Sequence, residues 1–417
     1  MSLKIKILLA VAMTLFMTGC GDLLGPDKEG WHYSQKTEFL EILKNDKYAS
    51  ICSKQGLYEQ VKESKNSVLM SKMLVAYAQN LANGCIDLVS FNNAQKRRNS
   101  IHFSSKYTSY LQEVNMKSIA MQLRAGQSIE QILSPYVPEY YQFYALLKHY
   151  HALKNAKEVN ETLLHTVRLN IERVKLMKPG LGKNYVLVNI PEYKVRIIED
   201  NNTSLSMRIV VGKRNKQTPI FSAELQSIVL NPTWNVPDSI ARHEIIPKTL
   251  KNPNYLKSHR LVIRKNYNLD SPALRFNPAQ ARAYVGGKGE VPFKFIEVAS
   301  RRNALGRVKF LFPNENAVYM HDTPAKHLFK RKVRAYSHGC VRLSSPMKML
   351  DFLADNYTNE TPENVTKEYR SKKTHYLKIV KRLPVHTAYL TSYVAEDGKL
   401  YFFKDIYRYD TLQKLNF

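Results

Sequence analysis

The chain has 417 residues, which is too many for one ordinary hydrophobic core, so we expect two or three domains. Hydrophobic residues make up 44% and charged residues 24%, a composition typical of folded globular proteins and not of disordered ones. The net charge is +28, from 63 Lys and Arg against 35 Asp and Glu. Such a charge favours polyanionic or carboxylate-rich partners and says nothing about the fold.

The N-terminus has the pattern of an export signal. Lys4 and Lys6 precede the apolar run Ile7–Phe16, which is too short to span a bilayer but suits the core of a signal peptide. The small residues just before Cys20 resemble a bacterial lipobox, in which the cysteine receives the lipid. An ordinary signal peptide with a chance cysteine is the alternative.

These features predict where the protein is placed in the cell. Residues 1–20 are predicted to be a lipoprotein signal peptide, and residues 21–30 a flexible tether. The protein is then periplasmic and held to a membrane through lipid on Cys20. Gly21, in place of an Asp retention signal, favours the outer membrane over the inner membrane.

The remaining cysteines can be assigned by their positions. An exported protein folds in an oxidising compartment, where two thiols can pair. Cys52 and Cys85 both lie in the N-terminal third, so we predict a disulfide between them; two separately buried thiols are the alternative. Cys340 is then unpaired, and an unpaired cysteine in an exported protein needs a reason.

The first half of the chain has helical periodicity. Apolar residues recur at i, i+3, i+4 and i+7 in two stretches, the first with Leu74, Tyr77, Ala78 and Leu81 and the second with Phe143, Leu146, Leu147 and Tyr150. We interpret these stripes as core faces. They predict a helical domain over residues 31–180.

The second half reads as strands. Short β-branched runs such as "YVLVNI", "KVRII" and "MRIVV" are separated by turn residues, and no helix-length segment joins them, which favours an antiparallel sheet. A stretch rich in Pro, Asn, Lys and Arg at about 236–292 predicts an insertion or lid. Ser345 and Pro346 are predicted to begin a helix. We therefore predict an α+β protein with a mostly-β domain over 181–375, which the strands of 376–417 complete.

Residues with useful chemistry gather near the end of this domain. A catalytic cysteine needs a nearby base or a positive field, and two strands joined by a basic loop could bring His321 to Cys340. Gly339 would let neighbouring amides point at one spot, as an oxyanion hole requires. Arg342, two residues past the cysteine, would share its strand face and could hold a substrate carboxylate.

This pattern favours a thiol-dependent acyl-transfer enzyme, with two alternatives. Zinc uses His and Cys ligands, but no C-x-x-C or H-E-x-x-H spacing is present, so we expect no metal; an inert buried thiol is the other alternative. We expect no cofactor. His327 lies in the basic loop and is interpreted as solvated surface. The signal peptide and the lack of a recognition motif argue against nucleic acid as a partner.

At these residues the sequence resembles a known family. His-Asp-Thr at 321–323 and "YSHGCVR" at 336–342 are similar to the signature of the L,D-transpeptidase catalytic domain, the YkuD family. Further stretches, among them "NYVLVNIPEYKVRI" and "VLNPTWNVPDSI", resemble the large periplasmic murein L,D-transpeptidases, which have a helical scaffold domain and an inserted capping subdomain. The resemblance covers nearly the whole chain from about Ser67 onward.

Two departures from that branch are visible. Only about twenty residues separate Tyr150 from Arg173, too few for the peptidoglycan-binding module usually found there. "EVASRRNALG" also lacks the usual Pro-Gly before the Asn-x-Leu-Gly stretch.

The resemblance implies a reaction on peptidoglycan stem peptides, which serve as donor and acceptor. Cys340 would attack the carbonyl between the third and fourth stem residues, with His321 as its base. Ser337 would position the histidine network, and His338 would support an oxyanion pocket formed by amides around Gly339 and Cys340.

The substrate-binding residues follow from the same resemblance. Arg342 would meet a stem-peptide carboxylate, and Tyr319, Trp234 and Asn235 would line the cleft. An L,D-carboxypeptidase or an amidase on the same scaffold is an alternative, because only the acceptor differs. A non-catalytic basic lipoprotein that binds the cell wall is another.

Overall fold

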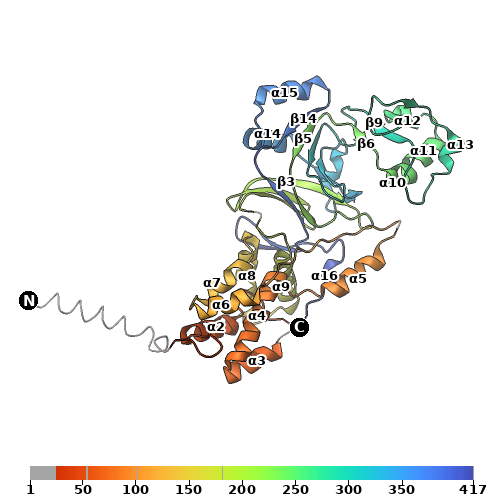
Figure 1. Ribbon diagram of the computed structural model, residues 1–417. Helices are drawn as coiled ribbons and strands as arrows, with labels where there is room; N and C mark the ends of the chain where they lie inside the picture. The colour runs from red at the N-terminus through yellow and green to blue at the C-terminus, as the bar shows by residue number, and fades with distance from the viewer. Residues whose placement is uncertain (1–24, 53–54, 101, 181, 417) are drawn as a thin grey trace, which may run out of the picture.

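The computed structural model describes residues 25–52, 55–100, 102–180 and 182–416. A helical layer lies at one end, a curled sheet lies in the middle, and a smaller lobe projects from the side of the sheet (Figure 1). No helix in the described ranges is long and apolar enough to cross a membrane. The predicted signal peptide and Cys20 lie outside the described residues.

The N-terminal part is helical, as the periodicity predicts. Asparagine side chains cap α4, α6 and α9 by accepting backbone N–H groups. The predicted stripes lie in one core, where Tyr77 and Phe143 are fully buried. The main helices are α2 (Tyr33–Asn45), α3 (Gln55–Ser64), α4 (Ser67–Asn83), α5 (Leu88–Arg98), α6 (Met116–Arg124), α7 (Ile129–Leu133), α8 (Tyr141–Lys154) and α9 (Glu161–Lys175), with the short η2 (Ser134–Tyr136) before α8.

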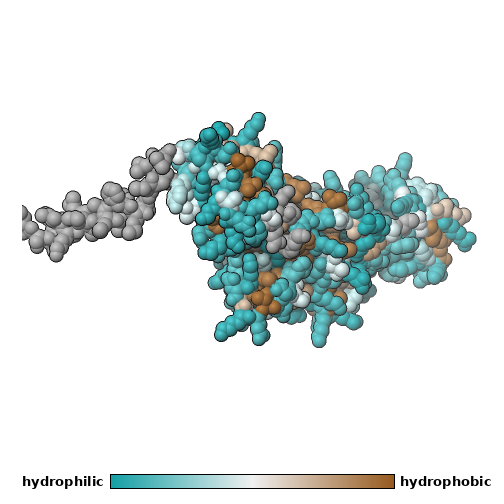
Figure 2. Space-filling view, turned by 90° about the horizontal axis from the view of Figure 1, so that it is seen from below, coloured by the Kyte–Doolittle hydropathy of each residue, from teal (hydrophilic) through white to brown (hydrophobic). Residues whose placement is uncertain are grey.

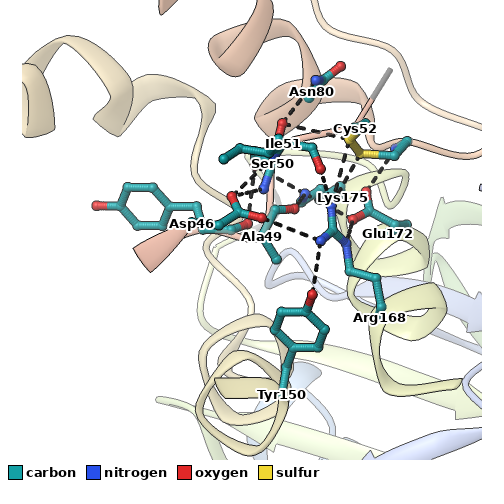
Figure 3. Close-up of a disulfide and its surroundings, with 12 residues drawn as sticks. Asp46, Ala49, Ser50, Ile51, Cys52, Asn80, Tyr150, Arg168, Glu172 and Lys175 are labelled. Atoms are coloured by element: carbon teal, nitrogen blue, oxygen red, sulfur yellow. Dashed lines mark hydrogen bonds and ion pairs between the residues drawn. A yellow bond between two sulfur atoms is a disulfide. The ribbon is translucent and has the colours of Figure 1, made fainter. Parts of the chain in front are cut away.

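A disulfide and a buried ionic cluster join the helices to one another. Cys52 and Cys85 form the disulfide expected from their positions, with Cα atoms 5.8 Å apart. Arg168 on α9 places Nη2 3.6 Å and 3.5 Å from the two sulfurs and binds Glu172 through Nε at 2.6 Å. Glu172 also accepts a hydrogen bond from the Cys85 amide and one from Lys175 (Figure 3). These buried charges are tolerated because each has a partner.

The second half of the chain is built on one mixed sheet. Its strand order is β14-β5-β10-β11-β13-β3-β2-β1-β15-β4, and β12 pairs with β3 off this path. The strands are β1 (Tyr185–Asn189), β2 (Lys194–Glu199), β3 (Asn202–Gly212), β4 (Phe221–Glu224), β5 (Ser227–Leu230), β10 (Val308–Leu311), β11 (Met320–His321), β12 (Ala335–Ser337), β13 (Val341–Leu343), β14 (His375–Lys378) and β15 (Pro384–Ala388). Helices α14 (Pro346–Tyr357) and α15 (Pro362–Ser371) follow β13, and Ser345 makes no side-chain capping bond to α14.

The prediction of an antiparallel sheet holds for most strand pairs but not for all. The pairs β1–β15, β11–β13 and β12–β3 are parallel. Each joins segments that are not connected by a hairpin, so the chain has room to return in the same direction. The parallel pair β11–β13 brings together the two strands that carry the candidate site.

The predicted insertion is a folded subdomain, which we call the cap. It has its own sheet, in the order β6-β9-β7-β8, and its own core around Val236, Ile246 and Phe295. Arg242 donates to four backbone carbonyls and thereby organises a glycine-rich loop. The elements are β6 (Trp234–Asn235), α10 (Asp238–Ile240), the π-helical turn η3 (Ala241–Ile245), α11 (Ile246–Lys251), α12 (Tyr255–Ser258), β7 (Leu261–Arg264), β8 (Ala273–Leu274), α13 (Pro278–Arg282) and β9 (Lys294–Glu297).

The C-terminal segment divides between the two halves of the molecule. β15 lies in the main sheet, but β16 (Ser392–Val394) and β17 (Leu400–Phe402) form a separate hairpin, and Tyr393 and Val394 join the helical core. The prediction that residues 376–417 complete the catalytic domain is therefore wrong for this hairpin, since its apolar side chains Tyr393 and Val394 pack into the core that the helices form. The short helix α16 (Tyr409–Leu412) follows.

Seen from below, the surface is largely hydrophilic, with separate apolar patches (Figure 2).

Loss of the Cys52–Cys85 disulfide should destabilise the helical half. The bond closes a loop with a sequence separation of 33, for which chain entropy gives roughly 3–4 kcal/mol of unfolding free energy. We expect reductant to lower the thermal unfolding midpoint of the parent protein and to leave a Cys52→Ala/Cys85→Ala variant unchanged. Two free thiols at these positions in the unfolded, unreduced protein would contradict the bond.

Candidate active site

The candidate site lies on one face of the three neighbouring strands β10, β11 and β13. His321 pairs with Lys309 on one side and with Arg342 on the other. Residues opposite each other in a ladder project to the same face, so these three side chains form a row across the sheet. Met320 and Val341 directly precede His321 and Arg342 along their strands. Both are buried in the apolar core on the opposite face of the sheet.

Cys340 lies on the same face as this row. It stands two residues before Arg342, next to Tyr319, and it is partly exposed; its sulfur is 3.9 Å from the Ala317 carbonyl oxygen. Burial raises the pKa of the Cys340 thiol, against the opposing effects of Tyr319, Lys309 and Arg342. The resting thiol is therefore protonated near neutral pH, and a base must activate it.

His321 is buried, and its imidazole is neutral near neutral pH, the form that can accept a proton. Burial lowers the pKa of its imidazole to about 3, with further lowering by the charges of Arg342 and Lys309. Nδ1 is bonded to the Asp322 carbonyl oxygen, which only accepts, so Nδ1 holds a proton there; the Leu305 backbone is a second hydrogen-bond partner of the ring and, like Asp322, raises its pKa against the effect of burial.

The thiol and the imidazole are diagonal neighbours and are not yet bonded. No hydrogen bond joins Cys340 to His321 in the described part of the chain, where the sulfur contacts the Ala317 carbonyl instead. Catalytic hydrogen bonds are often long before substrate binds, so this geometry is compatible with base catalysis.

Ser337 and Gly339 shape the turn before the cysteine, in a way that differs from the prediction. The Ser337 hydroxyl donates to the Cys340 carbonyl and accepts from the Gly339 amide at 3.1 Å, and it makes no hydrogen bond to a histidine among the described residues. The Gly339 amide is thus engaged and cannot form the oxyanion hole. Its φ of +123° explains why glycine is needed there. The amide of Cys340 donates to no acceptor among the described residues and is the better candidate.

His338 faces the cap, whereas the sequence predicted that it supports the oxyanion pocket. Its Nε2 lies 2.8 Å from Glu244 Oε1, on η3, and 3.4 Å from Lys213 Nζ. The physical reason is the positive φ of Gly339, which breaks the strand alternation that would have aligned His338 with Cys340. The contact with His338 lowers the pKa of the Glu244 carboxyl to about 2.

Only some of the predicted substrate-binding residues lie at the candidate site. Tyr319 packs edge-on against the His321 ring, with centroids 5.6 Å apart. Burial raises the pKa of the Tyr319 hydroxyl well above its usual value. A hydrogen bond with the Trp234 side chain opposes this effect, so Trp234 lies beside Tyr319. Arg342 keeps Nε buried and without a hydrogen-bond partner in the described structure. Asn235 is exposed and projects from the opposite face of β6 to Trp234, so it does not join the site.

Three residues near the site were missed by sequence reasoning. Lys309 lies on β10, and only strand register reveals that it faces His321. Glu244 lies in the Pro- and Lys-rich stretch without any motif. Thr218 donates from Oγ1 to the Gly339 carbonyl at 2.8 Å and so fixes the turn from outside the motif. Among the described residues, no group of three or more His, Cys, Asp or Glu side chains could hold a metal ion.

The fold and the site together define a mostly-β catalytic domain joined to a helical domain. Residues 183–365 match the family model of the L,D-transpeptidase catalytic domain, YkuD. The resemblance of these residues to the L,D-transpeptidase catalytic domain, predicted from their sequence motifs, is thereby confirmed.

Several known proteins are similar to the chain in sequence or in structure. A Haemophilus influenzae protein named "Putative L,D-transpeptidase" is 32% identical over 259 residues, which span 62% of this chain and 50% of that protein. The chain thus matches about half the length of this relative. An L,D-transpeptidase from Mycobacterium smegmatis is 13% identical, covers 49% of this chain and 58% of its own, and has a TM-score of 0.22. The E. faecium catalytic domain is 15% identical, with 50% and 99% coverage and a TM-score of 0.20. At such TM-scores the structural matches carry no argument.

Removal of the Ser337 hydroxyl should loosen the turn that holds Cys340. In Ser337→Ala the buried Gly339 amide loses its acceptor, at a cost of about 1–3 kcal/mol in unfolding free energy. We expect a lower unfolding midpoint and slower acylation of Cys340 by a carbapenem, followed by intact mass. Ser345→Ala is the matched control, because that serine makes no side-chain capping bond. Equal effects of the two substitutions would refute this role.

The Glu244–His338 contact should make cap docking depend on pH. The pKa of Glu244 is about 2 in the folded protein and 4.5 as its ordinary value, so its stabilising effect is present above about pH 4.5 and is lost as the pH falls toward 2. Hydrogen exchange at Ala241–Ile245 should be faster in Glu244→Gln than in the parent at pH 7. This difference should shrink below pH 4.5.

Substitution of the exposed Glu315 by Gln is the control for this experiment, since Glu315 has no ion pair within the described ranges. A Glu244→Gln protein with parental exchange at pH 7 would show that the contact does not hold the cap.

Proposed function

We propose that this protein is a cell-wall L,D-transpeptidase that transfers the acyl group of a peptidoglycan stem peptide through a thioester on Cys340. The observation that carries the proposal is the placement of an unpaired thiol and a neutral imidazole, His321, on one face of a YkuD catalytic domain. The proposal includes lipid attachment at Cys20 and a periplasmic location.

The first half of the reaction is acylation. His321 takes the proton from the thiol, and the sulfur attacks the carbonyl carbon between the third and fourth stem residues. The Cys340 amide donates to the developing oxyanion. The C–N bond then breaks, and the imidazolium returns its proton to the amine of the departing D-residue.

The second half transfers the acyl group. The amine of an acceptor stem peptide, or another amino donor, attacks the thioester carbonyl and gives up one proton to His321. The C–S bond breaks, the new amide forms, and the thiolate recovers the proton. Water in place of the amine would make the protein a carboxypeptidase, so the acceptor decides between these two activities.

Arg342 supports the recognition of a stem peptide. Its Nε is buried and has no hydrogen-bond partner among the described residues, and it shares the face of Cys340. A guanidinium in this position can bind the α-carboxylate of the leaving residue in two-point contact.

The proposal predicts a covalent carbapenem adduct on Cys340. Intact mass should show one adduct on the parent protein and none on Cys340→Ala. His321→Asn should react roughly 10²–10⁴-fold more slowly, because general base catalysis is lost. A folded parent protein without any adduct would instead favour a non-catalytic wall-binding role. Analysis of products from purified muropeptides would then separate new crosslinks from shortened stems.

A further inference from the structure

A groove of about 430 Å³ lies where the segment before α16 passes strand β12. None of its lining residues belongs to β10, β11 or β13, so it is separate from the active-site face. Its volume is in the range of small-molecule sites. The lining combines three cationic with three apolar side chains, namely Arg214, Lys404, Arg408, Val333, Ala335 and Ile406.

A fourth cation, Arg98 at the end of α5, lies beside this groove. Burial lowers the pKa of the Arg98 guanidinium, and the charges of Arg214 and Arg408 lower it further, so Arg98 is within electrostatic range of both. Its Nη2 donates to the Tyr407 carbonyl at 3.3 Å, whereas Nη1 is buried and has no hydrogen-bond partner among the described residues. A buried donor without an acceptor costs free energy, which a bound anion would recover. We call Arg98, Arg214, Lys404 and Arg408 the groove cations.

The groove cations are not neutralised by the protein. None of them forms an ion pair with a carboxylate in the described part of the chain. Asp405, which also lines the groove, is bonded elsewhere: it accepts from the Tyr389 hydroxyl at 2.6 Å and from the amides of Tyr409 and Asp410 at 2.8 Å and 2.9 Å. The groove therefore carries an excess of positive charge that attracts an anion.

Arg408 occupies a backbone conformation that arginine rarely adopts. Its φ is +62°, in the left-handed region that favours glycine. Residues are held in this region at a cost in free energy, and such strain is concentrated at binding sites. The chain places there a long, exposed cationic side chain, and a role in binding accounts for it.

We propose that the groove cations bind a phosphate group, presented by a soluble phosphomonoester or by a lipid headgroup. This site goes beyond the proposed transpeptidase reaction and does not depend on it. A phosphomonoester has a charge of about −1.5 to −2 at pH 7 and three acceptor oxygens, which suit several guanidiniums at once. A single carboxylate has one charge and two oxygens, so it would leave most of the groove cations unpaired.

The groove adjoins a support of the catalytic turn. Arg214 directly follows Lys213, whose amide donates to the Ser337 carbonyl at 2.9 Å. A phosphate that bridges Arg214 and Arg408 would therefore tie the C-terminal segment to the turn before Cys340. Because such a ligand binds the folded protein alone, it also raises the unfolding midpoint by mass action.

The test is calorimetric titration of the full-length protein with inorganic phosphate and with acetate at equal ionic strength. Phosphate should bind the parent protein at least tenfold more tightly than acetate and should raise its unfolding midpoint. Arg214→Gln/Arg408→Gln should weaken phosphate binding at least tenfold, since each substitution removes a charged hydrogen-bond donor. Lys404→Gln, a single change at an exposed side chain, should weaken it as well and serves if the double variant does not fold.

Arg301→Gln/Arg302→Gln is the matched control, because it removes the same charge from two exposed arginines outside the groove. It should bind phosphate as the parent protein does. Binding of phosphate no tighter than acetate, or equal losses in the two double variants, would overturn the proposal.

Two esters distinguish the sources of the phosphate group. Glycerol 3-phosphate carries it without acyl chains, and dihexanoyl phosphatidate adds chains that can contact Val333 and Ile406. Tighter binding of the phosphatidate, reduced in Val333→Ser, would identify a lipid headgroup, and equal binding of both would identify a soluble phosphomonoester. Failure of both esters to bind would overturn the site.

Discussion

The parallel pairing of β11 with β13 is the constraint on which the candidate site depends. It aligns Met320 with Val341 and His321 with Arg342, and thereby places an apolar row in the core and a reactive row on the open face. A shift of one residue would send Cys340 into the core and Val341 to the surface. The fully buried Met320 and Val341 oppose such a shift, so hydrophobic burial holds the catalytic register.

The turn that presents the cysteine is held from behind by residues remote in sequence. Thr218 binds the Gly339 carbonyl, and the Tyr407 hydroxyl accepts from the Thr218 amide at 3.1 Å and donates to the Gly212 carbonyl at 2.7 Å. Ser105, from the helical half, bonds to Gln217 and Tyr409 in the same region. The C-terminal segment and the helical domain thus take part in positioning a loop that belongs to the catalytic domain.

Patterns of local sequence predicted much of this protein, and contacts between distant segments account for the rest. Three features follow from periodicity or from backbone sterics, and the structure has each of them. They are the buried helical stripe at Tyr77, the positive φ of the glycine before Cys340, and the shared face of Cys340 and Arg342. The partner of His338 is not of this kind. Its direction is set by the φ of Gly339 and by Glu244 about a hundred residues earlier, and no short window contains both. Lys309 was not predicted as a site residue for the same reason, since only the register of β10 with β11 shows that it lies beside His321.

The cap leaves and rejoins the catalytic domain at a single place. Its first strand pairs with its last, with Trp234 opposite Glu297, so the two ends of more than sixty intervening residues lie side by side. Changes of length within that span need not disturb the strands that hold the thiol and the imidazole. Evolution can therefore remodel the cap residues that lie beside Tyr319 and His338 while the strands that hold Cys340 and His321 stay the same.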